Sequence, residues 1–445
     1  MAPSRSSDTP VVLGGLAVGV AAESAMVIGG SRLIGPAGLV LTLVASAAWA
    51  FVAFDARAER RPRLVMAAIA VAFTVAIVVP PRGSQDLWAY VMYGRTVSVH
   101  HTSPYVHAPG DFPHDVFTAR VGSGWRHAKS VYGPLFTGGS AVVTRLAGDS
   151  ALRARLAFQA LAALGITGAL AVIWRAKHSA RALAFLGLHP AVVTAVVNGG
   201  HNDALVGLAL VGGALLAARR AWYRAGFVLA LGVLVKASAG LGLVAVAVWT
   251  WRRDPRGAAR LALVAAATTI AAYGPVGLIA VRDIAHAGNG NTRASVWDPI
   301  STVLHPNATL MTIGALALAA VAAWRWSRAA HPATTSLATT AAYLIGGVYV
   351  LPWYPVWALP SAALERRSRL AALVGAHAAF LVAVYEYEAP AHVTLSGAWG
   401  VIRSVLTQLG AWTALAVFVA MLVGARWRRA RSGTSRSASS GAHRS

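Results

Sequence analysis

Long apolar runs constrain the fold of this chain more than any other feature. Several come close to the roughly 20 residues that a helix needs to cross a lipid bilayer, including Val11–Gly30, Leu64–Pro80, Leu261–Ile279 and Ala411–Val423. Backbone inside a bilayer must satisfy its own hydrogen bonds, and runs of this length do so as helices. Only 12% of the residues are charged, against about 25% in soluble domains. The sequence therefore predicts an all-α, polytopic transmembrane helical bundle.

Arginine gathers in short segments between the apolar runs. Of the 39 cationic residues 36 are Arg, and the main clusters are Arg57, Arg60, Arg61 and Arg63; Arg219, Arg220 and Arg224; Arg252, Arg253 and Arg256; and Arg366, Arg367 and Arg369. This is the positive-inside pattern of membrane proteins. The net charge of +24 therefore indicates orientation in the bilayer and not nucleic-acid binding. Cysteine is absent, which excludes disulfides and thiolate metal sites.

Loop charge predicts which segments face outward. With the N-terminus and the Arg57–Arg63 cluster inside, the run Leu64–Pro80 emerges on the outer face and places the long segment Pro81–Val131 outside. Counting back from a basic C-terminal tail on the inside leads to the same frame, with Arg282–Pro306 and Glu386–Arg403 outside. We expect a multi-pass protein of the cell membrane with a long outer loop.

The middle of the chain fits more than one arrangement. Two hairpins are predicted there, Leu183–Asn198 with Ala204–Ala218 and Gly226–Val235 with Ala237–Trp251. If both hairpins form, the segment between Tyr132 and Trp174 contains one membrane crossing more than the outer and inner positions of the flanking loops allow. Either Tyr132–Ala147 is therefore a re-entrant or interfacial helix, or one hairpin is a single span. Gly133 and Pro134 favour the first arrangement. We expect about 11 to 13 spans in total.

The chain divides into four regions on this frame. They are two accessory spans with a cytoplasmic loop (1–63), a core that carries the outer loop 81–131 (64–306), C-terminal spans (307–424) and a disordered basic cytoplasmic tail (425–445). The tail holds six Arg and no acid, and we expect it to rest on anionic lipid.

Asp86 is the most informative single residue, because only 15 of the 445 residues are acidic. It follows the run Leu64–Pro80, begins the sequence DLWAY, and opens the longest loop. A carboxylate on the outer rim of a bundle is suited to accept the proton of a sugar hydroxyl as a glycosidic bond forms. The structural alternative is a helix-end acid or an ion pair with Arg82 or Arg95.

Three polar residues, His201, Asn202 and Asp203, follow two glycines at a predicted outer turn. Gly199 and Gly200 permit sharp turning and a close backbone approach. A helix cap before Ala204 accounts for Asn202 or Asp203 alone, but it does not require all three polar side chains. We interpret the three as groups that contact donor or acceptor hydroxyls.

Lys236 is one of three lysines in the chain, and apolar runs flank it on both sides. A compact ammonium group suits the phosphate of a lipid-linked substrate, and Arg126 and Lys129 of the outer loop are candidates to assist it. The alternative is a lysine that reaches the interface from a helix end.

Aromatic residues recur on the predicted outer face, namely Trp88, Tyr90, Tyr105, Trp125, Tyr132, Trp297, Trp353 and Tyr354. Singly they are typical of an interfacial aromatic belt, but as a group they would stack on sugar rings. Five histidines also lie in the outer loop: His100, His101, His107, His114 and His127. None pairs with a carboxylate at metal-binding spacing. We predict no metal site and no cofactor, and leave a divalent cation open.

Taken in order, these motifs resemble the GT-C glycosyltransferases, and most closely the polyprenol-phosphate-mannose-dependent α-1,6-mannosyltransferases that extend lipomannan in actinobacterial envelopes. The matching segments are QDLWAY (85–90), SPY (103–105), YGPL (132–135), GHNDAL (200–205), VKA (235–237) and PWY (352–354). YGPL and HND occur across several GT-C branches, whereas the ordered set is more specific.

The resemblance implies a GT-C bundle on whose outer face Asp86 is the catalytic base. It also implies inversion at the sugar carbon, a polyprenyl-phosphate leaving group, and a mannan or glycolipid acceptor. The chain departs from the family in its compact length and in His189-Pro190, where members more often have Asn-Pro.

Three other functions compete with this one. A lipid-phosphate-dependent arabinofuranosyl or other pentosyl transferase would differ only in the shape of its pocket. A lipid or sugar transporter would need paired ionisable groups on opposing broken helices, and the sequence has no visible internal repeat. A scaffold for envelope enzymes would leave Asp86 and Lys236 without a task. We therefore predict an inverting mannosyltransferase whose active site faces the exterior.

Overall fold

The computed structural model describes residues 8–33, 35–277, 279–282, 292–304, 307–386 and 398–437. Within these ranges the chain is a bundle of α-helices joined by turns and by short 3-10 and π segments, without a strand. The predicted all-α class is confirmed.

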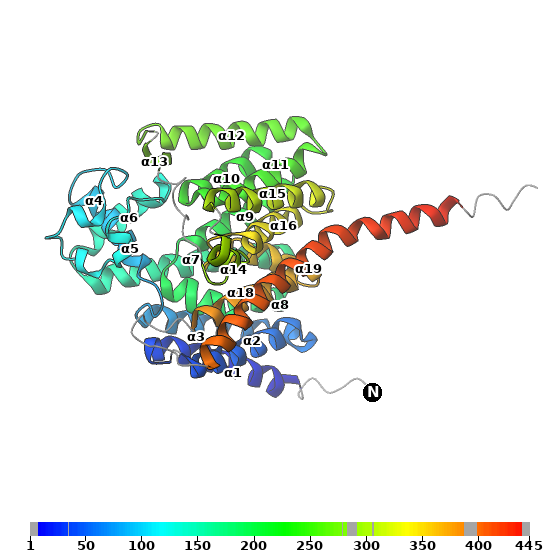
Figure 1. Ribbon diagram of the computed structural model, residues 1–445, viewed down its shortest axis with the longest axis horizontal. Helices are drawn as coiled ribbons and strands as arrows, with labels where there is room; N and C mark the ends of the chain where they lie inside the picture. The colour runs from blue at the N-terminus through cyan, green and yellow to red at the C-terminus, as the bar shows by residue number, and fades with distance from the viewer. Residues whose placement is uncertain are drawn as a thin grey trace, which may run out of the picture.

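The N-terminal helices form one side of the bundle. They are α1 (Asp8–Gly29), α2 (Pro36–Phe54) and α3 (Pro62–Val78), joined by the turns η1 (Gly30–Leu33) and η2 (Ala56–Arg60). Helix α1 packs against α2 and α3, and the three lie along the bottom of Figure 1. Proline in the first turn starts both α2 and α3, since its missing N–H would have no partner there.

A separate group of short helices follows α3. These are α4 (Asp86–Ser98), η3 (Pro109–Asp111), η4 (Thr118–Arg120), α5 (Ser123–Arg126) and α6 (Pro134–Ala147). Helix α4 packs against α6, and the group stands at the left of the molecule in Figure 1. It contains the predicted outer loop 81–131.

The central helices carry the rest of the first half of the chain. They are α7 (Ala151–Lys177), α8 (Ala180–Gly187), the π-helix η5 (Ala191–Val197), α9 (Asp203–Ala218), α10 (Trp222–Val235), η6 (Ala237–Ala239), α11 (Gly240–Trp251) and α12 (Pro255–Tyr273). Helix α9 packs chiefly against α7 and α10. Helices α8 and η5 are bent by 49° at His189-Pro190, where proline has no N–H for a helical bond.

The C-terminal helices complete the bundle. They are α13 (Ile279–Arg282), α14 (Asp298–Leu304), α15 (Ala308–Trp326), α16 (Pro332–Gly346), η8 (Tyr354–Trp357), α17 (Leu359–Leu364), α18 (Arg369–Glu386) and α19 (Ala398–Ser437). Helix α19 continues into the segment 425–445 that was expected to be disordered. In the predicted outer loops at 282–306 and 386–403, residues 283–291, 305–306 and 387–397 lie outside the described residues.

In the part of the chain that the structure describes, five helices are long and apolar enough to cross a membrane: α1, α2, α7, α15 and the Ser404–Gly424 part of α19. The bent α8–η5 pair makes a sixth if it forms one span. Five more apolar helices are shorter, at 10–17 residues: Pro62–Val78, Asp203–Ala218, Trp222–Val235, Ala237–Trp251 and Arg369–Tyr385. The total of 11 to 13 spans stays a prediction that depends on these shorter helices. Helix α6 is in neither group, which agrees with an interfacial or re-entrant position.

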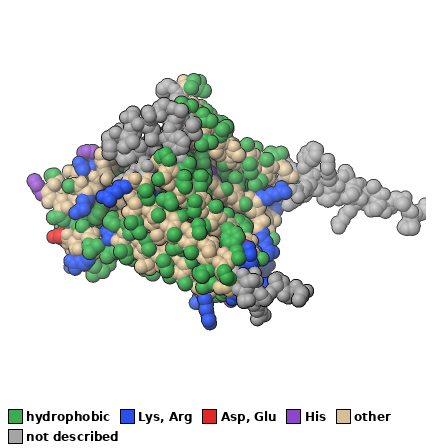
Figure 2. All heavy atoms as spheres, turned by 90° about the horizontal axis from the view of Figure 1, so that it is seen from below, with side chains coloured by type: hydrophobic (Ala, Val, Ile, Leu, Met, Phe, Trp, Pro, Cys, Tyr) green, Lys and Arg blue, Asp and Glu red, His purple; other side chains and the backbone are tan. Residues whose placement is uncertain are grey.

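The surface has the character of a membrane protein. Figure 2 shows hydrophobic side chains over the middle of one face, with Lys and Arg gathered toward its two ends. In Figure 1 the start of α1 and the end of α19 both lie on the side opposite the α4–α6 group. This arrangement agrees with termini on one side of the bilayer and the predicted outer loop on the other.

The boundary of one predicted span was wrong. The apolar run Leu261–Ile279 suggested a helix that starts at residue 261, but α12 begins at Pro255 and ends at Tyr273. Asp254 caps its start by accepting the N–H of Gly257 at 2.8 Å. Gly274 and Pro275 follow its end and stop the helix although the sequence stays apolar.

Side chains from two segments that are distant in the sequence cap the C-terminal end of α3. Gln159 and Arg155 of α7, together with Asn198 after η5, donate to the backbone carbonyl groups of residues 76–80 at 2.9–3.2 Å. Asn198 Oδ1 also accepts the N–H of Arg82 at 3.0 Å. A helix leaves its last carbonyl groups unpaired, and here amide and guanidinium groups satisfy them. The chain is thereby held in place directly before Asp86.

We predict that Gln159→Met lowers the unfolding temperature and reduces activity. Methionine keeps the volume of glutamine but removes the donor to the carbonyl groups of Ala76, Val79 and Asn198, of which the first two keep only the Asn198 amide; the loss of such buried hydrogen bonds costs about 1–3 kcal/mol. Thermal unfolding in detergent measures this loss. The matched control is Gln408→Met on α19, where the side chain is only partly buried. Equal unfolding temperatures for wild type and Gln159→Met would contradict the proposed bracing.

Candidate active site

Asp86 is the first residue of α4, and only 13% of its side chain is exposed. The indole N–H of Trp125 on α5 donates to its Oδ1 at 2.8 Å, and its own backbone N–H donates to Ser84 Oγ at 3.1 Å. Of the ion-pair partners considered from sequence, Arg95 pairs with Asp115 at 2.8 Å and with Asp149 at 2.9 Å. The hydrogen bond to the Asp86 carboxylate thus comes from a neutral donor, the indole of Trp125.

The turn between η5 and α9 places His201 next to this carboxylate. Its Nδ1 lies 3.8 Å from Asp86 Oδ2 and 3.3 Å from the hydroxyl of Tyr90. The imidazole stacks on Trp353, with ring centroids 3.8 Å apart and an interplanar angle of 13°. Burial, aided by the positive charge of Lys236, holds the pKa of His201 well below its ordinary value. The ring is therefore neutral at physiological pH.

Lys236 and Asp203 form a largely buried ion pair. Lys236 follows the last residue of α10, and its Nζ donates to Asp203 Oδ1 at 2.8 Å. The same oxygen accepts the indole N–H of Trp357 at 2.6 Å. Lys236 Nζ also lies over the ring of Tyr354, 4.3 Å from its centroid. The ammonium group is therefore surrounded by one carboxylate and by aromatic faces, which attract a cation.

A tight backbone contact joins the Lys236 segment to the start of α6. The N–H of Gly133 donates to the carbonyl of Val235 at 3.0 Å, and a Cβ at position 133 would collide with the carbonyl of Leu234. Only glycine permits this approach. It places Tyr132 edge-to-face against Tyr90, with ring centroids 5.0 Å apart.

Several buried polar atoms in this cluster have no hydrogen-bond partner among the described residues. They are both side-chain polar atoms of Asn202, Nε2 of His201 and Oδ2 of Asp203. Asn202 is 2% exposed and the other two residues are fully buried. Since buried polar groups normally have partners, these atoms are candidates to contact substrate hydroxyls.

Burial raises the pKa of Asp86 above the ordinary value of 3.8, and the nearby charge of Asp203 raises it further. The Trp125 hydrogen bond and the positive charge of Lys236 act in the opposite direction. A raised pKa makes the carboxylate a stronger base than a solvent-exposed aspartate.

Four residues that were selected from the sequence make no described contact with Asp86, His201 or Lys236. Tyr105 donates to the carbonyl of Tyr132 at 2.9 Å and so braces the outer loop. Trp297 donates to the carbonyl of Gly346 at 2.8 Å. Arg126 donates to the carbonyl of Val121 at 3.2 Å, and Lys129 is exposed. Among the described residues, no contact links Arg126 or Lys129 to Lys236.

Sequence reasoning missed Trp357. It is three residues after Tyr354 on η8, and the two rings stack with centroids 4.6 Å apart. Three residues make one turn of a 3-10 helix, so a 3-10 reading of the Tyr354-Pro355 segment would have put Trp357 beside Tyr354.

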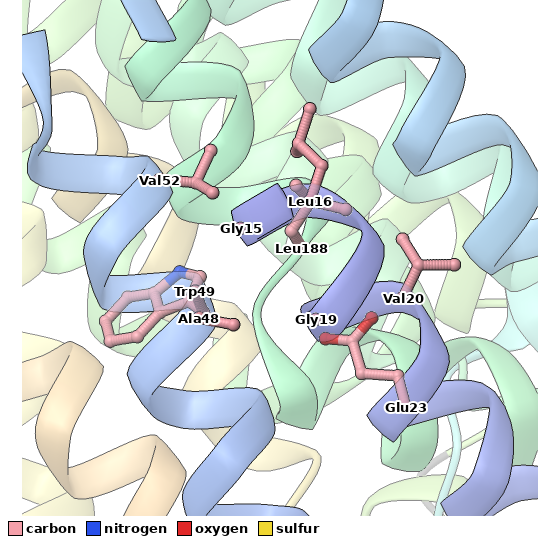
Figure 3. Close-up of a pocket in the computed structure, with 9 residues that line it drawn as sticks. All are labelled: Gly15, Leu16, Gly19, Val20, Glu23, Ala48, Trp49, Val52 and Leu188. Atoms are coloured by element: carbon pink, nitrogen blue, oxygen red, sulfur yellow. The ribbon is translucent and has the colours of Figure 1, made fainter. Parts of the chain in front are cut away.

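The described residues contain no group of three or more His, Asp or Glu side chains that could hold a metal ion. A further buried acid, Glu23, lies apart from the cluster, on α1. It lines a small cavity with Gly19, Trp49 and Leu188, as Figure 3 shows. The carboxylates of Asp86 and Glu23 therefore belong to different sites.

The sequence was compared with known families and proteins. The profile described as alpha-(1→6)-mannopyranosyltransferase, N-terminal domain, matches residues 7–253, more than half of the chain. The chain belongs to this family. The resemblance seen in the sequence motifs is thus confirmed, and the matched region contains Asp86, His201 and Lys236.

One curated relative is alpha-(1→6)-mannopyranosyltransferase A of Corynebacterium glutamicum, which is 30% identical over 186 residues. The alignment covers 39% of this chain and 37% of the relative, so the chain matches little more than a third of that protein's length. No solved structure matches the chain. Trp353, Tyr354 and Trp357 lie beyond the family match, and the structure alone joins them to the site.

We predict that Gly133→Ala destabilises the protein and lowers its activity, because the new methyl group meets rigid backbone at Leu234. Gly138→Ala on the same helix is the control, since a Cβ there has nothing within 4 Å. Thermal unfolding and an activity assay should separate the two variants. Similar behaviour of both would mean that the close approach at Gly133 is unimportant.

Proposed function

We propose that this protein transfers mannose from a polyprenyl-phosphate donor to a hydroxyl group of a mannan or glycolipid acceptor, on the outer face of the cell membrane. Family membership supports mannosyl transfer. The main support for the chemistry is that one aromatic cluster contains both a carboxylate, Asp86, and a largely buried ammonium group, Lys236.

Transfer requires a base for the acceptor. The acceptor hydroxyl gives its proton to Asp86 while its oxygen bonds to the sugar carbon. The bond between that carbon and the phosphate oxygen breaks, and its electron pair leaves with the phosphate. A single displacement of this kind inverts the sugar carbon. Asp86 fits the role because its Oδ1 accepts the Trp125 N–H, whereas its Oδ2 lies 3.8 Å from His201 Nδ1, beyond hydrogen-bond distance.

Lys236 is placed to stabilise the leaving phosphate. A phosphate that develops negative charge is bound best by a fixed cation in a site from which water is excluded. Its present partner Asp203 offsets the ammonium charge and fixes its position. The aromatic faces of Tyr354 and Trp357 keep the ammonium group directed toward the cluster. Arg126 and Lys129 would contribute only at longer range.

The remaining polar and aromatic groups form the sugar pocket in this proposal. Trp353 stacks one ring face on neutral His201, so its opposite face is the one assigned to the apolar face of a sugar. Asn202 offers a donor and an acceptor at one buried position. Tyr90, Tyr132 and Tyr354 close the cluster. The proposal assigns no metal ion, and the assay below tests for one with a chelator.

We predict that Asp86→Asn lowers transfer by roughly 100-fold or more, the usual contribution of a general base. Purified protein would be assayed with radiolabelled polyprenyl-phosphate mannose and short α-mannosides, with and without a chelator. An arabinofuranosyl-phosphate lipid would serve as the competing donor. Asp149→Asn is the control, because that acidic side chain is 72% exposed. Near-normal activity of Asp86→Asn would disprove the assignment.

We predict that kcat/KM of the wild type falls as the pH is lowered through the pKa of Asp86, because the base acts only when ionised. Burial raises that pKa above 3.8, so the acidic limb should lie above the value of an ordinary aspartate. A pH–rate profile measures it. A limb at or below the ordinary aspartate pKa would contradict a buried base.

We predict that the double variant Lys236→Gln with Asp203→Asn folds but loses about 10- to 100-fold in kcat/KM for the donor. The paired amides retain a hydrogen bond, whereas a single substitution would strand a buried charge. Lys129→Gln, in which an exposed cation is removed, should change the value far less. Equal effects of the two changes would contradict a special role for Lys236.

A further inference from the structure

The hydrogen bond between Trp125 and Asp86 joins the outer loop to the base. Trp125 lies on α5, a four-residue helix, and its Nε1 donates to Asp86 Oδ1 at 2.8 Å. Helix α5 is close to Asp86 for a second reason: Gly122, at its start, packs against the side chain of Gln85, where a Cβ would meet Gln85 Oε1. Two contacts therefore hold α5 over the first turn of α4.

This bond makes the two carboxylate oxygens of Asp86 unequal. Oδ1 accepts the indole N–H, whereas Oδ2 lies toward His201 at 3.8 Å. An N–H donor binds a carboxylate more strongly than a neutral carboxylic acid. The bond therefore favours the ionised form of Asp86 and fixes its rotation, which leaves Oδ2 as the oxygen that can meet an acceptor hydroxyl.

We propose that Trp125 is a positioning residue for the base: its indole N–H orients Asp86 so that Oδ2 takes the acceptor proton, and it keeps the carboxylate ready to do so. This inference rests on the proposed function, in which Asp86 is the base. It assigns to the outer loop a direct part in catalysis, beyond covering the site.

Other titratable groups also face Asp86. They are Tyr90 and Tyr93 on α4, Tyr132 before α6, His201 and Asp203 at the start of α9, Lys236 after α10, and Tyr349 and Tyr354 near η8. Of these, Lys236 favours the ionised carboxylate and Asp203 opposes it. Substitution of Trp125 leaves all of them in place, so a change in titration can be assigned to the lost N–H.

The test is the pH dependence of kcat/KM for Trp125→Phe, which keeps an aromatic ring and removes the N–H. The acidic limb should move upward by about one pH unit. Activity lost at low pH should be largely recovered at high pH, where Asp86 ionises unaided. The position of the limb does not depend on how much of the variant is folded, so a partly unstable protein still gives a readout.

Trp88→Phe is the matched control. Trp88 stacks on Phe117 with centroids 6.0 Å apart, and among the described residues its indole N–H has no hydrogen bond. The acidic limb of the kcat/KM profile of Trp88→Phe should match that of the wild type. A second variant, Trp125→His, returns a ring N–H and should bring the limb back toward the wild-type position.

Two results overturn the inference. An unshifted acidic limb in Trp125→Phe would show that the indole does not act on the base, and equal shifts in the Phe and His variants would show that the ring and not its N–H is responsible. Failure of the proposed function looks different, because Asp86→Asn would then remain active whatever the Trp125 variants do.

Discussion

Carbonyl groups at the end of α3 determine where the site lies. Inside an apolar bundle these groups have no water to bind, and each unpaired one would be costly. Arg155, Gln159 and Asn198 supply the missing donors. Since Asp86 begins α4 only a few residues later, the same contacts also hold the backbone that leads to Asp86 in place. Asn198 also precedes the glycines that turn the chain toward His201, so one side chain orders both segments.

The second constraint is the cost of burying charge. Lys236 and Asp203 lie together where neither would be stable alone, and a buried pair contributes little net stability. In the proposed function the pair serves as a preorganised cation for a phosphate. Asp86 is held differently, since its Oδ1 accepts a neutral indole N–H and a neutral imidazole lies 3.8 Å from its Oδ2. Its pKa is raised by burial, and the proposal uses this carboxylate for proton acceptance and the nearby ammonium group for leaving-group stabilisation.

Sequence reasoning found the main polar groups of the cluster. Asp86, Asp203 and Lys236 stood out because acids and lysines are rare in an apolar, arginine-rich chain, and His201 stood out beside Asp203 after two glycines. The structure brings all four together. The class of fold followed from the apolar runs alone. Helix ends were harder to predict. Helix α12 starts at its Asp254 cap, and a cap of this kind has no signal in the hydropathy of the sequence.

The supporting contacts could not be predicted. Gln159 meets the end of α3 across 83 positions of sequence, and Trp357 meets Asp203 across 154. Such contacts depend on how helices pack and leave no periodic pattern in the sequence. Arg126 and Lys129 were selected as basic residues of the outer loop; their part at the phosphate stays a prediction, because Arg126 has its described contact at Val121. Trp125 was visible only as one aromatic residue among many.

The anomeric configuration of the product tests the central claim most directly, because it separates a base from a nucleophile at Asp86. Purified protein would be incubated with polyprenyl-phosphate mannose and a short α-mannoside, and the new linkage would be determined by NMR. We expect a product whose configuration is opposite to that of the donor, formed in a single displacement. A product with the donor's configuration would exclude a single inverting displacement and would contradict the mechanism assigned to Asp86.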